Sequence, residues 1–156
     1  MTEAAVGNPP RVSAGVLRRC GAMLYDLLVV AALLFILTAL FLPFTGGEAI
    51  TPDRSAAIER IYQAALLLGV VLFFCVFWTW RGQTVGMLAW RLRVERSDGT
   101  SLTWRDALVR LAGAWLSFAA LGLGYFWIWI DRDRLAWHDR LSGTRVVVLP
   151  KKRKSG

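Results

Sequence analysis

Three long stretches of this sequence contain almost no charged side chain. Residues 61–80 and 111–130 hold no Asp, Glu, Lys or Arg, and residues 20–47 hold only Asp26. A helix crosses the hydrocarbon core of a bilayer, roughly 30 Å thick, with about 20 apolar residues. The first and second stretches along the chain meet that length, so the sequence predicts a membrane protein. The length of 156 residues suggests one domain.

The first two of these apolar stretches define the expected helices. We expect the first helix over roughly Ala14–Leu42, ending near Pro43, and the second from near Ser55 to near Trp80. The apolar part of the first, residues 22–44, exceeds the roughly 7–15 residues of a signal-peptide core, so this helix should be retained.

The net charge of +8 raises the possibility of nucleic-acid binding, but the position of the charges argues against it. Basic residues cluster before the first stretch, between residues 81 and 110, and after residue 131, whereas the loop at 45–60 carries two Arg and three acids. Lys and Arg mark the cytoplasmic side of short loops. We therefore expect a protein of the cell (inner) membrane, with a cytoplasmic N-terminus and a cytoplasmic C-terminus.

The chain divides into three parts on composition. Residues 1–13 are expected to be a disordered leader, residues 14–149 the membrane domain, and residues 150–156 a basic tail. The tail would face anionic lipid of the cytoplasmic leaflet; the alternative is a solvated basic tail with no specific ligand.

The third apolar stretch, Leu111–Ile130, allows two topologies. A single crossing would place the basic C-terminal residues outside, against the positive-inside rule. Gly122 and Gly124 offer bend points in its middle. We therefore favour a re-entrant helical hairpin with its tip near Gly122, with a third span as the alternative.

The segment between the second and third stretches contains shorter elements. Val85, Leu88, Ala89 and Leu92 follow helical spacing and predict a short amphipathic helix at the interface. Residues 91–96 alternate in polarity, and a turn at 97–99 followed by 100–104 predicts a hairpin. Residues 144–150 are another strand candidate that could pair with the hairpin; the alternative is that all of these residues form loops. The fold class is thus an all-α membrane protein with a small cytoplasmic β element.

Asp26 is the charged residue inside the first expected helix. Arg19 shares its helix face, but the rise separates the two by roughly 10 Å, and Arg19 should point away toward the cytoplasm. Asp26 therefore needs another donor. It is either an interface aspartate that pairs with a nearby arginine, or an inward-facing carboxylate that handles ions or protons.

His138 and Asp139 lie side by side in the C-terminal part. His138 could switch charge near neutral pH, or the pair could be a structural hydrogen-bonding node. No nucleophile, metal-ligand set or phosphate loop accompanies them, which argues against an enzyme and predicts no metal and no cofactor. The candidate polar intramembrane site contains six residues: Arg19, Asp26, Arg110, Arg134, His138 and Asp139.

Three ordered motifs resemble those of the RDD family. "RRCGAMLYD" provides Arg19, Ala22 and Asp26; "GQTVGMLAWRLRVERSDGT" provides a Gly-Gln-Thr-x-Gly element and an Asp-Gly turn; "RLAWHDRLSGTRVV" provides a closing His-Asp…Gly-Thr element. The chain departs from the family pattern at Met87, often Lys, and at Ala136, often Thr.

The resemblance implies an integral membrane protein of bacterial type, and transport, including cation/proton exchange, has been suggested for some members. One hypothesis is therefore transport through Asp26 with a cationic partner such as Arg110 or Arg134, in a homo-oligomer because few helices cannot enclose a pathway. The second is a membrane-embedded assembly or interaction module with structural charges. A membrane enzyme using His138 and Asp139 ranks last.

Overall fold

The computed structural model describes residues 12–46 and 56–150, and its two longest helices are those expected. Helix α1 spans Val16–Phe41 and helix α2 spans Ala56–Trp80; a short 3-10 helix, η1 (Leu42–Thr45), follows α1. Pro43 lies in the first turn of η1, where its missing N–H is tolerated. Both helices are long and apolar enough to cross a membrane. The prediction of two full transmembrane helices is confirmed.

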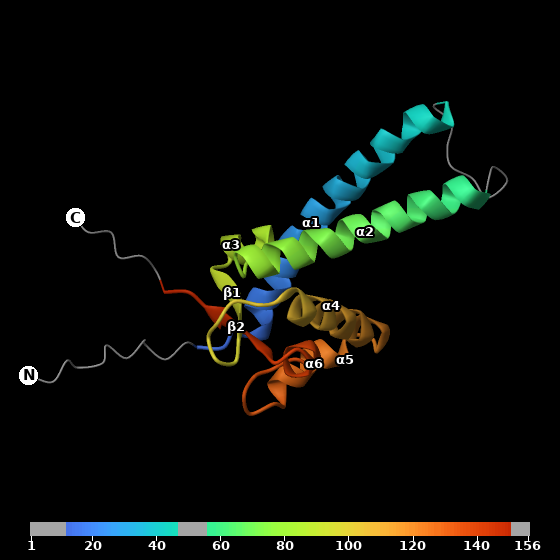
Figure 1. Cartoon of the computed structure of the whole chain (residues 1–156). Coiled ribbons are helices and arrows are strands. Elements are labelled where there is room, and N and C mark those ends of the chain that lie inside the picture. The colour runs from blue at the N-terminus through green and yellow to red at the C-terminus, as the bar shows by residue number, and fades with distance from the viewer. Residues whose placement is uncertain (1–11, 47–55, 151–156) are drawn as a thin grey trace, which may run out of the picture.

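The remaining elements gather at one end of these two helices (Figure 1). They are α3 (Val85–Ala89), β1 (Leu92–Arg96), α4 (Trp104–Ala119), α5 (Leu123–Phe126), the 3-10 helix η2 (Trp127–Trp129), α6 (Trp137–Leu141) and β2 (Thr144–Val148). We call this end of α1 and α2 the sheet end. The short helix expected from residues 85–92 is confirmed, although Leu92 already belongs to β1.

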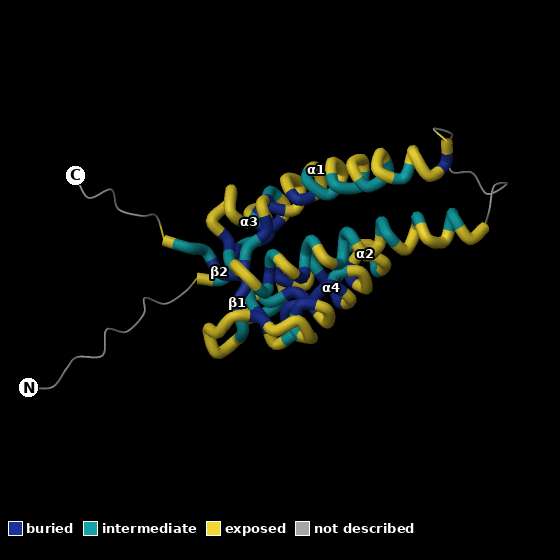
Figure 2. The backbone as a smooth tube through the Cα atoms, turned by 45° about the horizontal axis from the view of Figure 1, so that its top comes forward, coloured by how far each residue is buried: buried dark blue, intermediate teal, exposed yellow. Residues whose placement is uncertain are grey.

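Buried residues concentrate at the sheet end (Figure 2). All four buried residues of α1 lie between Val16 and Asp26, and those of α2 are Cys75 and Trp78. Beyond them both helices expose large apolar side chains such as Phe35 and Leu68. Exposed apolar surface along span-length helices implies contact with membrane lipid.

The third apolar stretch is bent rather than straight. Helix α4 begins with a capping box between Thr103 and Asp106, and it ends at Ala119. Leu121 and Gly122 then adopt positive φ, and the segment that follows runs at 107° to α4. The bend lies where Gly122 predicted it, because glycine adopts this backbone conformation without a steric cost. Re-entry on one side of the membrane stays a prediction.

The sheet has two antiparallel strands, β1 and β2, with Val94 opposite Val146. The predicted pairing with the C-terminal strand is thus confirmed, and the predicted return strand at residues 100–104 is wrong. The reason is local: Thr103 caps α4, so the chain after the turn enters a helix instead of a return strand.

The N-terminal segment also joins this sheet. Ser13 forms a bridge with Val147, and the N–H of Val148 donates to the carbonyl of Val12 at 3.0 Å. Val12 and Ser13 fall within the predicted leader, residues 1–13, and both pair with β2. The rest of the leader, residues 1–11, and the tail after Pro150 lie outside the described residues.

Candidate functional site

One face of α1 carries three buried residues, Arg19, Ala22 and Asp26, in the first half of the helix. Positions separated by three and by seven residues lie on one side of a helix. Arg19 contacts Asp139 of α6, whereas Ala22 and Asp26 both lie against α3. The face therefore joins the first span to the rest of the sheet end.

The side chain of Arg19 forms its hydrogen bonds within this junction. Its Nη1 donates to Oδ2 of Asp139 at 2.5 Å, and its Nε donates to the carbonyl of Ala14 at 3.0 Å. Arg19 points away from Asp26, as predicted, but its side chain is buried against the sheet end, with only 5% of its surface exposed. Asp139 lies 120 residues later in the chain, so helix geometry around Arg19 could not reveal it.

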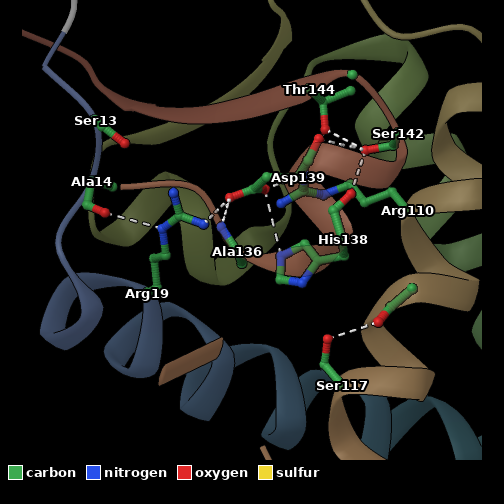
Figure 3. Close-up of polar contacts among 12 residues, drawn as sticks. Ser13, Ala14, Arg19, Arg110, Ser117, Ala136, His138, Asp139, Ser142 and Thr144 are labelled. Atoms are coloured by element: carbon green, nitrogen blue, oxygen red, sulfur yellow. Dashed lines mark hydrogen bonds and ion pairs between the residues drawn. The ribbon is translucent and has the colours of Figure 1, made fainter. Parts of the chain in front are cut away.

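Arg110 binds the same carboxylate from α4 (Figure 3). Its Nη1 donates to Oδ1 of Asp139 at 2.6 Å and to the hydroxyl of Thr144 at 2.7 Å. Its guanidinium carbon also lies 5.3 Å from the centre of the Trp78 ring, within range of a cation–π interaction. Trp78 is thus part of the core at the sheet end.

Asp139 holds these elements together from the first turn of α6. Its Oδ2 also accepts a hydrogen bond from the N–H of Ala136 at 3.0 Å. Burial alone would raise the pKa of Asp139, but Arg110 and Arg19 outweigh it and keep the pKa below the ordinary value of 3.8. We call Arg19, Arg110 and Asp139 the arginine cluster; two cations share one anion, so it carries a net charge of +1.

His138 lies against this cluster in a buried position. Its Nε2 is 3.5 Å from Oδ1 of Asp139, and its ring centre is 4.7 Å from that of Tyr125. Burial, followed by the repulsion of Arg110, lowers the pKa of His138 from 6.5 to about 3. The imidazole is therefore neutral at physiological pH, and the structure gives no support to a switch near pH 7.

The lowered pKa of His138 predicts an acid-sensitive fold. Below pH 6.5 the unfolded chain protonates its one histidine while the folded protein does not, so stability falls as the pH falls from 6.5 towards 3. Between pH 7 and pH 5 we expect a loss of about 2 kcal/mol. Unfolding in detergent measured at both pH values should show this loss, and His138→Gln should remove it. An unchanged pH dependence in that variant would contradict the assignment.

Asp26 forms a separate site with α3. Its Oδ2 accepts from the Thr84 hydroxyl at 2.5 Å, and its Oδ1 accepts from the Gly86 N–H at 2.8 Å. The expectation that Asp26 does not contact Arg19 is confirmed. The pairing with a cation such as Arg110 or Arg134 is wrong, because within residues 12–46 and 56–150 Asp26 forms no ion pair.

Arg134 is the expected site residue that contributes only its backbone. Its side chain is exposed, and its carbonyl accepts from the hydroxyl of Ser13 at 3.3 Å and from Nη2 of Arg19 at 3.4 Å. The structure thus brings together Arg19, Arg110, His138 and Asp139, and it places Asp26 and the Arg134 side chain elsewhere.

The six candidate site residues omit three contributors, Thr84, Trp78 and Thr144, although Thr84 and Thr144 lie in the motifs that resemble the family. Thr84 caps α3, and its hydroxyl accepts from the N–H of Met87 at 3.2 Å while it donates to Asp26. A threonine directly before a short helical pattern is a recognisable cap signal, which could have identified it. Within the described part of the chain, no group of three His, Cys, Asp or Glu side chains could hold a metal ion.

Span-length apolar helices joined at one end by buried polar clusters define a multi-pass integral membrane protein. The RDD family matches residues 13–143, and the chain belongs to this family. A relative is an uncharacterized protein of Rickettsia prowazekii (strain Madrid E), 29% identical over 84 residues, which are 54% of this chain. The chain spans about half of that relative, 47%. None of the solved structures matches significantly.

The family motifs acquire distinct structural roles. Gln83 donates from Nε2 to the carbonyl of Leu92 at 2.7 Å, which ties the start of α3 to β1. Asp98 accepts from the N–H of Thr100 at 2.9 Å, which stabilises the turn after β1. Met87, one of the two departures, packs against the main apolar core.

Proposed function

We propose that this protein is a subunit of a membrane transporter for protons or small cations, with Asp26 as the group that exchanges them. The supporting observation is a buried carboxylate in a span-length helix that is bound only by two neutral donors among the described residues. Ionisable residues inside membrane segments are costly, and they commonly mark ion pathways.

The contrast with Asp139 supports the choice of Asp26. Asp139 is already neutralised by two guanidinium groups, so a cation that approached it would be repelled. Asp26 lacks such a partner, and the Thr84 hydroxyl beside it can turn from donor to acceptor. Carboxylate and hydroxyl oxygens together are suitable ligands for a hard cation or a site for a proton.

A single chain of this size cannot enclose a pathway, so the proposal includes a homo-oligomer. Two spans and one bent apolar pair leave most of α1 exposed within the described residues. The distribution of Lys and Arg supports a cytoplasmic sheet end, a re-entrant bent pair and a cell inner membrane location. Binding of anionic lipid by the basic tail is part of the same proposal.

The test replaces the Asp26 carboxylate with an amide of the same shape. In proteoliposomes loaded with a pH-sensitive dye, the wild-type protein should couple an imposed Na⁺ or K⁺ gradient to proton movement. Asp26→Asn should lose this coupling because its amide carries no exchangeable charge. Asp133→Asn, at an exposed acid, is the matched control and should retain it. Full coupling in Asp26→Asn would remove this residue from the mechanism.

A second candidate is a non-catalytic membrane assembly module. It is favoured by the fact that the bonds of Asp26 attach α3 to α1, while those of Asp139 attach α6 to α1 and α4. On this hypothesis Asp26→Asn lowers the unfolding temperature in detergent and the wild type shows no ion-dependent proton movement. Both candidates treat the protein as non-enzymatic: the His138 ring contacts Asp139 and Tyr125, and the Ser142 hydroxyl donates to the His138 backbone carbonyl instead of to the ring.

A further inference from the structure

We propose that the protein binds an anionic phospholipid at a hollow formed by α5, η2 and the start of α6. The hollow has a volume of about 290 Å³ and is open to the surface. Its wall is entirely apolar or aromatic: Leu123, Phe126, Trp127, Trp129, Ile130 and Trp137. This site does not involve Asp26, so it stands or falls independently of ion transport.

The wall has the character of a membrane-interface site. The rings of Trp127 and Trp137 lie 6.2 Å apart, and those of Phe126 and Trp129 lie 5.4 Å apart. Tryptophan is enriched at the level of the lipid headgroups, where one side of the ring is apolar and the other meets water. A volume of this size is at the lower limit for ligand pockets, so it suits a segment of an acyl chain rather than a whole molecule.

Two unpaired cations lie on the turn that joins the two sides of the wall. Arg132 and Arg134 follow Ile130 and precede Trp137, both are exposed, and neither forms an ion pair within the described residues. The turn itself is held by Asp131, whose Oδ2 accepts from the N–H of Leu135 at 2.9 Å. By contrast, Arg140 is occupied by Asp131 and Asp133.

An apolar hollow beside two free arginines matches an acyl chain attached to a phosphate group. A guanidinium binds a phosphate through charge-assisted hydrogen bonds, and each basic residue near the surface strengthens the attraction to anionic lipid. A second copy of this chain fits less well, because a two-fold contact would bring the same arginines face to face. The charge complementarity therefore selects an anionic phospholipid as the occupant.

Native mass spectrometry of the full chain in detergent tests the proposal with two added lipids of equal acyl chains, phosphatidylglycerol and phosphatidylcholine. The wild type should retain phosphatidylglycerol preferentially. The double variant Arg132→Gln/Arg134→Gln should bind it about thirtyfold more weakly, the loss expected for two surface arginines. Arg105→Gln is the matched control, since Arg105 is likewise exposed beside an exposed tryptophan, Trp104, but outside the wall.

A second variant tests the apolar half of the site. Ile130→Glu places an acid on a wall residue that is 76% exposed, so folding should be unaffected and retention of phosphatidylglycerol should fall. Equal retention of the two lipids by the wild type would overturn the proposal. The proposal would also be overturned if the double variant and Arg105→Gln lost equal amounts of phosphatidylglycerol binding. A lipid-free dimer that these variants dissociate would overturn it as well.

Discussion

Asp139→Asn should destabilise the protein by about 3–5 kcal/mol, the cost of removing one member of a buried ion pair. The asparagine has the same shape, but it leaves Arg19 and Arg110 buried with no opposite charge in the arginine cluster. Reversible unfolding in detergent should show the loss, and the yield of folded protein should fall with it. The effect should be much the same at pH 7 and pH 8, where all three groups of the wild type are charged.

Two further variants distinguish the loss of charge balance in the arginine cluster from the effect of removing an exposed ion pair. Arg19→Gln should cost less than Asp139→Asn, because Arg110 and Asp139 remain as a neutral pair after it. Asp133→Asn should change stability by less than about 1 kcal/mol, since its carboxylate is 70% exposed in its contact with Arg140. If the two arginine-cluster variants cost the same, a net charge of +1 would not describe that cluster.

The sequence was sufficient for those features that depend on local pattern. The apolar stretches located α1 and α2 to within two residues, and Gly122 located the bend, because hydropathy and backbone freedom are properties of single segments. The limit of this reasoning appears at residues 100–104. This segment and residues 144–150 both had strand character, but the cap at Thr103 starts α4 after the turn, and only β2 pairs with β1.

The partners of Arg19 and Asp26 could not be predicted from local sequence pattern. Asp26 meets Thr84 and Gly86, and Arg19 meets Asp139, so each contact joins residues that are 58 or more positions apart. The sequence indicated that Asp26 required a donor, because a carboxylate in a span is costly. It favoured arginines because they are the obvious counter-ions. The structure instead satisfies Asp26 with a hydroxyl and a backbone amide, which no charge pattern reveals.

The close approach of α3 to α1 gives the second large expected effect. A Cβ atom at Gly86 would lie 2.0 Å from the carbonyl oxygen of Ala22 and 3.0 Å from the carboxyl carbon of Asp26. The backbone carbonyl of Ala22 cannot rotate out of the way as a flexible side chain can, so α3 would have to move away from α1. That movement would also lengthen the hydrogen bond from the Gly86 N–H to Asp26, which is 2.8 Å in the structure.

Gly86→Ala should therefore destabilise the protein by about 3 kcal/mol, at the upper end of the usual cost of overpacking. Gly15→Ala is the matched control, because its φ is −68° and a Cβ there would meet no atom within 4 Å. Unfolding of both variants in one detergent gives the comparison. Adding Ala22→Gly to Gly86→Ala should not restore stability, since the clash involves the backbone carbonyl of residue 22 and not its methyl group. Restoration by that second change would show that side-chain crowding, rather than the approach of two backbones, sets the requirement for glycine at this position.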